Sequence, residues 1–189
     1  AMALPQDEDT RRWASLALRR IRDSVRVQVY EDGSQWEQSP MYHNEVFHCL
    51  CCVVYLARAN GIRLDPGLEE TVHRMALADV IWRKPDGCQF IQGDSDEVDL
   101  RDKITMGAWL FRDPVLKYAG FDRMDFEGAW DFGRKASLEY RSLPAEKPGF
   151  TSACLKDSGN YYLRESWEEN ANLLHFTCGA MSTGHCHGD

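Results

Sequence analysis

The chain is organised around one stretch of sequence, Trp36-Glu-Gln-Ser-Pro-Met-Tyr-His-Asn-Glu45. It opens the most apolar helix that the sequence predicts, over about residues 39–60. Ser39 suits the N-cap because its hydroxyl can accept a hydrogen bond from a free first-turn N–H, and Pro40 suits the first helical position, where no donor is needed. The stretch therefore predicts a sharply defined helix start with polar side chains in its first turn.

These polar side chains, Tyr42, His43 and Asn44, lie near the positive end of the helix dipole. An imidazole placed there tends to stay neutral, because an imidazolium would face positive partial charge. A neutral imidazole can accept a proton and a neighbouring amide can hold an oxyanion, which makes the three residues candidates for catalysis. The alternative is that Tyr42 and His43 only close a buried helix end.

Apolar residues recur at helical spacing in five segments, at about 9–29, 39–60, 65–84, 100–119 and 122–142. The second segment is apolar nearly all round between residues 46 and 57, so we expect it to be an inner, buried helix. In the fifth segment we expect the large apolar side chains to lie in the core; they are Phe126, Trp130, Phe132 and Leu138.

After Pro144 the apolar period changes from helical to alternating. Residues 150–155, 161–165 and 173–178 read as strands, and Asp157-Ser-Gly-Asn160 reads as a hairpin turn. The predicted fold class is therefore α+β and mostly α. Residues 1–145 form antiparallel helix hairpins, and residues 146–189 form the start of an antiparallel sheet domain.

Composition excludes several classes of partner. The 189 residues are 43% hydrophobic and 28% charged, which is typical of a soluble globular protein. No run of 18 apolar residues exists, so we expect no membrane partner. The net charge of −8 and the pI near 5.3 argue against nucleic-acid binding, which needs a basic surface.

The cysteines and the first residues of the chain indicate the cellular compartment of the protein. The seven cysteines are odd in number and irregular in spacing, so we expect mostly reduced thiols and a cytoplasmic protein. Cys49, Cys51 and Cys52 fall inside a predicted helix, where buried thiols are the default. Residues 1–5 lack the basic and apolar regions of a signal peptide; a leader removed earlier would instead indicate a periplasmic or secreted protein.

Two further segments carry polar side chains of interest. Residues 88–99 form a loop that turns acidic and is expected to cap the next helix; a calcium loop is the alternative, although the glycine and the closing glutamate of an EF-hand are missing. Near the end, His185-Cys-His187 on an extended segment places both imidazoles on one face, with Asp189 beyond, and zinc takes such ligands. A tag-like tail and an HxH metal hydrolase are the alternatives.

Four stretches together resemble the heparinase II/III-like polysaccharide lyases, which include oligo-alginate lyases. They are Glu37-Gln-Ser-Pro-Met-Tyr-His43, Pro85-Asp-Gly87 leading to Gly93-Asp-Ser-Asp96, Asp157-Ser-Gly-Asn-Tyr-Tyr-Leu-Arg164 with Trp167, and Gly184-His-Cys-His-Gly-Asp189. The resemblance implies a partial (α/α) toroid followed by the first strands of an antiparallel β-sandwich. A part of that fold leaves apolar helix faces and sheet edges uncovered. The resemblance therefore also implies a partner that covers them, either the remaining parts of a longer chain or further copies in a homo-oligomer.

The resemblance also implies a reaction, β-elimination at a uronic acid of an acidic polysaccharide or oligosaccharide. His43, with Asn44 or Tyr42 beside it, would bind the substrate carboxylate or act as base, and His185 would reach the cleft from the β side. Other substrate contacts would come from matching stretches, at Glu37, Asp94 and Asp96. His187 would be one ligand of a structural zinc whose other ligands lie beyond this chain.

One departure from the family pattern leaves the reaction open. In the alginate-lyase branch a catalytic tyrosine follows the Pro-Asp-Gly turn by about a dozen residues, but here that place reads Asp96-Glu-Val-Asp99. Either Tyr42 or a tyrosine outside this chain serves instead, or the protein binds carbohydrate or acts as a scaffold without turnover. A metal-dependent hydrolase that uses His185 and His187 is the third hypothesis.

Overall fold

The computed structural model describes residues 7–181. Its helices are α1 (Glu8–Gln28), α2 (Pro40–Ala59), α3 (Pro66–Trp82), α4 (Arg101–Phe111), α5 (Pro114–Ala119) and α6 (Phe126–Arg141). Its strands are β1 (Ala153–Leu155), β2 (Asn160–Arg164) and β3 (Leu173–Thr177). The predicted α+β class with mostly helix is confirmed. The predicted boundary at residue 145 falls between α6 and β1, and a division into two domains stays a prediction.

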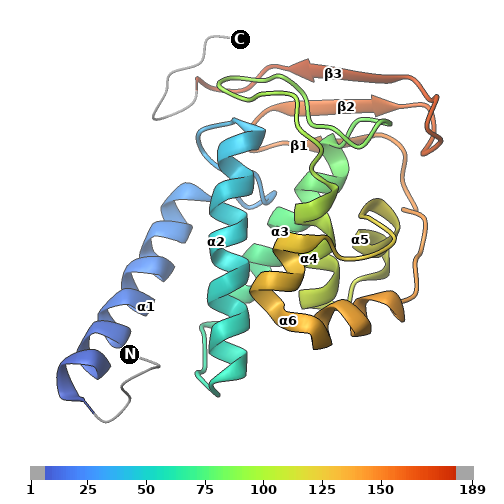
Figure 1. Cartoon of the computed structure of the whole chain (residues 1–189). Helices are drawn as coiled ribbons and strands as arrows, with labels where there is room; N and C mark the ends of the chain where they lie inside the picture. The colour runs from blue at the N-terminus through green and yellow to red at the C-terminus, as the bar shows by residue number, and fades with distance from the viewer. Residues whose placement is uncertain (1–6, 182–189) are drawn as a thin grey trace.

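The sheet lies across one end of the helical layer, and α1 runs along the outer side of α2 (Figure 1). Helix α4 packs against α2, α3, α5 and α6 and so lies at the centre of the helical part. Side chains with no exposed surface fill the space between these helices; they include Phe47, Val54, Val72, Met75 and Ile104. The expectation that α2 is buried nearly all round is met only in part, because one face of the helix is buried whereas Cys49 and Leu56 are exposed. Within residues 7–181, no helix combines the length and the apolar character needed to cross a bilayer.

Helix α2 starts where the sequence predicts, with Ser39 at the N-cap and Pro40 in the first turn. The Ser39 hydroxyl makes no capping bond, contrary to prediction, because it lies 2.8 Å from the hydroxyl of Ser95. The Met41 N–H donates instead to Ser95 Oγ at 3.0 Å. A serine from the loop before α4 therefore takes over the cap and ties that loop to the start of α2.

The predicted helix over residues 100–119 is in fact two helices. Arg112 adopts a left-handed conformation (φ 56°) at the end of α4, and Asp113 caps α5 by accepting from the Val115 N–H at 2.7 Å. Pro114 has no N–H to donate and disfavours helical geometry at the residue before it, which explains the break. The loop acids behave as expected at the other end, since Asp99 Oδ1 accepts from the Arg101 N–H at 3.0 Å.

The prediction that the large apolar residues of α6 lie in the core is wrong for three of the four. Phe126 and Trp130 are 81% and 78% exposed and stack on each other, and Leu138 is also exposed. Phe132 alone among them is buried. Phe126 and Trp130 are four residues apart and share one helix face, and that face points to solvent rather than to α4.

A glycine interrupts α6. Gly133 has φ 83° and ψ 168°, a region that essentially only glycine occupies, and a Cβ added there would meet open space. Gly133→Ala therefore isolates the backbone cost, and we expect the free energy of unfolding to fall by about 1–3 kcal/mol. Urea unfolding measures it, with Gly149→Ala as the matched control because that position is equally open and has no positive φ. Equal stability of the two variants would contradict the account.

The antiparallel sheet has the order β1-β2-β3 and one apolar face in solvent. Tyr161 pairs with Phe176 and Leu163 pairs with Leu174, and all four side chains are exposed. Tyr162, between them in β2, points inward and is buried. Such an uncovered sheet face is what a part of a larger fold would leave, while the partner that covers it stays a prediction.

Hydrogen bonds at two places tie the β1–β2 hairpin to the helical part. Asp32 accepts from the Asp157 N–H at 2.8 Å, and Asp157 in turn accepts from the Asp32 N–H at 3.0 Å; we call this reciprocal pair the brace. Arg164 of β2 donates to the carbonyl oxygens of Ile81 and Arg83 at 3.3 and 2.5 Å. These bonds hold the β1–β2 hairpin against the loop before α2 and against the end of α3.

We expect Asp32→Ala to lower the free energy of unfolding by about 2–3 kcal/mol, because bonds to an ionised acceptor contribute about 1.5–3 kcal/mol. Besides Asp157, the carboxylate accepts from the Ser34 N–H at 3.0 Å, and that bond is lost too. Chemical denaturation measures the change. Glu31→Ala, one residue earlier and exposed, is the control and should stay near wild type. A loss of the same size in both variants would argue against the brace.

Candidate functional site

The start of α2 holds His43 in a closed environment. The side chain is 1% exposed, and its Nε2 lies 3.2 Å from the carbonyl oxygen of Met75, so Nε2 carries the proton that it donates there. Its Nδ1 has no hydrogen-bond partner among residues 7–181. The edge of the ring meets Trp82 at 4.6 Å between centroids, and Nε2 lies 3.7 Å from Asp79 Oδ1.

Burial sets the charge of this contact. It lowers the pKa of His43 to about 3, so the imidazole is neutral at pH 7, as predicted. The reason differs from the predicted one, since removal from water rather than the helix dipole is the main cause. Burial also raises the pKa of Asp79 well above its usual range. His43 and Asp79 thus meet as a contact between uncharged groups and not as an ion pair.

The neighbours of His43 differ in access to solvent. Asn44 is 5% exposed, and its Nδ2 donates to Gln89 Oε1 at 3.0 Å, while Gln89 Nε2 donates to the Asp96 carbonyl oxygen at 2.8 Å. Tyr42 is only half-buried. Of the three candidates in the first turn, Tyr42 is therefore the one whose side chain reaches the surface.

The expected substrate-binding acids lie around this helix start. Glu37 is half-buried and its Oε1 accepts from Gln35 Nε2 at 3.0 Å. Asp94 and Asp96 are exposed on the loop whose Ser95 caps α2. The structure therefore brings Glu37 and the 94–96 loop to the end of α2 that carries Tyr42.

A polar network that the sequence analysis missed lies behind His43. Asn160 Oδ1 accepts from Gln92 Nε2 at 3.0 Å and from Thr177 Oγ1 at 3.2 Å, and it lies 2.9 Å from His175 Nε2. A cavity of about 10 Å³, the size of one water molecule, separates these groups from His43. Asn160 was assigned to a turn, and only its pairing with Thr177 across β2 and β3 reveals its role.

His185 and His187 lie outside the described residues, so their predicted roles, including the zinc expected at His187, stay predictions. The described chain does lead toward the site. The carbonyl oxygen of Ala180 accepts from Gln38 Nε2 at 3.0 Å, which holds the segment after β3 against the turn before α2.

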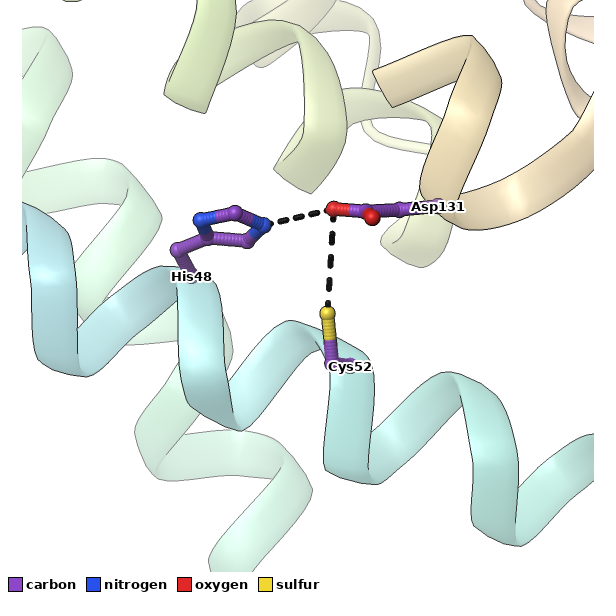
Figure 2. Close-up of side chains that lie close together, drawn as sticks. All are labelled: His48, Cys52 and Asp131. Atoms are coloured by element: carbon purple, nitrogen blue, oxygen red, sulfur yellow. Dashed lines mark hydrogen bonds and ion pairs between the residues drawn. The ribbon is translucent and has the colours of Figure 1, made fainter. Parts of the chain in front are cut away.

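A second group of polar side chains lies further along α2, where His48 and Cys52 face Asp131 of α6 (Figure 2). The sequence does not reveal this group, because Asp131 is 83 residues from His48. The one local signal is that His48 and Cys52 are four residues apart on a predicted helix. The reading of the α2 cysteines as buried thiols holds for Cys51 but is wrong for Cys49, which is exposed, and for Cys52, which is half-buried. Partial burial raises the pKa of the Cys52 thiol to about 11.

Comparison with known proteins gives a consistent result. The family model described as Heparinase II/III N-terminus matches residues 1–118. A heparin-sulfate lyase from Pedobacter heparinus is 24% identical over 184 residues, which are 92% of this chain and 24% of that protein. A heparin-sulfate lyase from Bacteroides stercoris is 22% identical over 190 residues, which are 98% of this chain and 26% of that protein. The chain thus spans about a quarter of the length of these curated relatives.

Solved structures show the same fold. The crystal structure of heparan sulfate lyase HepC from Pedobacter heparinus superposes with a TM-score of 0.77 at 23% identity, over 100% of this chain and 28% of that chain. A crystal structure of heparinase III superposes with a TM-score of 0.68 at 20% identity, over 93% of this chain and 27% of that chain. The six helices and three strands described here therefore match about a quarter of a larger architecture.

Proposed function

The chain belongs to the heparinase II/III family, and from this premise we propose that the protein it forms is a polysaccharide lyase that cleaves a uronic-acid-containing glycan by β-elimination. In this reaction the substrate carboxylate is neutralised, a base removes the C5 proton, and an acid protonates the departing glycosidic oxygen. Groups that transfer protons in such a step contribute about 10²–10⁴-fold each. The relatives named above are heparin-sulfate lyases, so heparan sulfate and heparin are the first substrates to test.

The observation that carries the proposal is the unequal access of the first-turn residues. Tyr42 is half-buried at the start of α2, whereas His43 and Asn44 are buried and held by Met75 and Gln89. We assign proton transfer to the Tyr42 phenol, which can donate to a departing oxygen. His43 and Asn44 then act as positioning residues that hold the first turn against α3 and the 83–99 loop.

His185 remains in the proposal as a group that meets the substrate from the β side. The bond between Gln38 and the Ala180 carbonyl oxygen supports this, because it brings the chain that leads to His185 beside the start of α2. We assign sugar contacts to Glu37 and to the exposed Asp94 and Asp96, because their segments lie at the end of α2 that carries Tyr42. Carboxylates cannot attract an anionic glycan, so their part is to accept hydrogen bonds from sugar hydroxyls.

The test follows ultraviolet absorbance of the unsaturated uronate product. Heparan sulfate, heparin, hyaluronan, chondroitin and alginate are each incubated with the 189-residue chain and with a version lengthened at both ends to the size of its relatives. We expect absorbance to rise with heparan sulfate on the lengthened protein. A folded, lengthened protein that gives a flat signal on every glycan would overturn the proposal.

The burial of His43 and Asn44 favours one alternative, a carbohydrate-binding protein without turnover. Their polar atoms are already engaged inside the protein, apart from His43 Nδ1 and Asn44 Oδ1, which face its interior. Under this alternative the lengthened protein retains heparan sulfate on an affinity gel but generates no unsaturated product. A single substitution that abolishes both heparan sulfate binding and product formation would instead favour the lyase.

A further inference from the structure

His48 and Cys52 lie one helical turn apart on the same face of α2 and both point at Asp131 of α6 (Figure 2). His48 Nε2 is 2.6 Å from Asp131 Oδ2, and Cys52 Sγ is 3.9 Å from the same oxygen. The His48 and Asp131 side chains are 19% and 23% exposed, and Cys52 is half-buried. The three side chains therefore form a small cluster that solvent can reach.

The chemistry of these donors indicates a particular ion. One imidazole nitrogen, one sulfur and one carboxylate oxygen are the ligand types that zinc binds, and the sulfur and nitrogen disfavour calcium and magnesium. We propose that His48, Cys52 and Asp131 bind one Zn²⁺ ion that links α2 to α6. Three protein ligands leave the fourth tetrahedral position to a water molecule, for which the partial exposure of the cluster leaves room.

The distances between the donors fit this assignment with a small adjustment. The three ligand atoms lie within 4.8 Å of one another. Zinc bonds of about 2.0–2.3 Å place tetrahedral donors roughly 3–4 Å apart. His48 Nε2 and Asp131 Oδ2 are closer than this because they share a proton, so they separate by roughly half an ångström when the ion takes its place. His48 then carries its proton on Nδ1 and binds the ion through Nε2, while the Cys52 thiol proton passes to solvent.

The scaffold around the cluster is already in place. One turn beyond Cys52, Tyr55 packs edge-on against Phe132 at 5.2 Å between centroids, and its hydroxyl donates to the Phe132 carbonyl oxygen at 3.4 Å. Gly133 then turns the chain out of regular helix, so Asp131 lies in the last turn before that break. The two helices are thus held together beside the ligands, and binding requires no rearrangement of the backbone.

Cobalt(II) is the probe, because it occupies zinc sites and its absorption reports both tetrahedral geometry and thiolate ligation. The titration uses the full chain with His185→Ala, Cys186→Ser and His187→Ala, which removes the potential ligands of the last residues. We expect one equivalent of Co²⁺ with a sulfur-to-cobalt charge-transfer band, and displacement of that band by Zn²⁺. Carboxylates alone give no such band, which excludes the neighbouring group of Asp102, Asp125 and Glu127 as its source.

Variants in the same background identify the ligands. Cys52→Ser should remove the charge-transfer band, and His48→Ala and Asp131→Asn should each weaken Zn²⁺ affinity at least tenfold. Cys49→Ser is the matched control, because Cys49 is exposed on the same helix and outside the cluster, and it should leave both band and stoichiometry unchanged. Absence of a stoichiometric ion, or a band that survives Cys52→Ser, would overturn the proposal. Circular dichroism of each variant verifies that the fold is kept.

Discussion

Tyr42→Phe should lower kcat of the lengthened protein on heparan sulfate by about 10²–10⁴-fold, with a much smaller change in KM. The reason is that the variant loses only the phenolic proton, and proton transfer by a positioned side chain contributes about this factor. The ring stays in place, so we expect the substrate to bind as before. Steady-state kinetics by uronate absorbance give both constants.

The same substitution elsewhere provides the control. Tyr161→Phe removes a phenolic hydroxyl from the exposed outer face of the sheet, opposite to the face that carries the buried Tyr162, and should leave kcat unchanged. If Tyr42→Phe kept its kcat while Tyr161→Phe also did, proton transfer would have to be reassigned, with His185 as the next residue to replace. A rise in KM at constant kcat would show that Tyr42 binds substrate without transferring a proton.

The second large effect concerns the free energy of unfolding at acidic pH, which His43 lowers and Asp79 raises in the wild-type protein. His43 has a pKa near 3 in the fold against 6.5 when exposed, so below pH 6.5 the unfolded chain binds a proton that the folded protein does not, and stability falls as pH falls. Asp79 acts in the opposite direction. Its raised pKa keeps a proton on the folded protein, so it contributes stability below the usual pKa of 3.8 that is lost as pH rises.

Between about pH 4 and pH 6 the two contributions act in opposite directions as the pH falls, since His43 lowers the stability and Asp79 raises it. Asp79→Asn leaves the His43 contribution alone, and we expect the stability of this variant to fall by about 2–3 kcal/mol as the pH falls through this window, at about 1.4 kcal/mol for each pH unit. His43→Gln should gain a similar amount relative to wild type as the pH falls. Urea unfolding at several pH values measures both slopes.

Two further variants make the result specific. The double variant His43→Gln with Asp79→Asn carries neither titrating group and should lose both the slope of Asp79→Asn and that of His43→Gln. Phe47→Leu, one turn along α2 and fully buried, should lower stability at every pH without changing the slope. Parallel pH curves for Asp79→Asn and wild type would mean that Asp79 lacks the raised pKa described above, and parallel curves for His43→Gln and wild type would mean the same for the lowered pKa of His43.

How far the sequence predicts this fold depends on whether the signal is local. Pro40 and Asn60-Gly61 mark the ends of α2 correctly, because caps act on the neighbouring turn. Phe126 and Trp130 were misplaced, because periodicity identifies a helix face but not which face meets the rest of the protein. A helix that is covered by other segments in a larger architecture shows the same pattern as one that faces its own core.

The candidate site shows the same division. The order Tyr42-His43-Asn44 is visible in the sequence, and the helix start around it is correct. Which of the three reaches solvent depends on Trp82 and Gln89, residues of α3 and of the following loop that no local pattern connects to α2. Asn160 and Asp131 escaped notice for the same reason, since their partners come from distant parts of the chain.

The brace between Asp32 and Asp157 has a consequence for how the chain folds. Its two residues are 125 positions apart, so its formation closes a very long loop at a large cost in chain entropy. That cost falls once other contacts between the two residues have formed and the remaining loop is shorter. The helices form from local contacts and can dock first. We therefore expect the sheet to settle onto a preformed helical layer late in folding, with the brace among the first bonds to open when the protein unfolds.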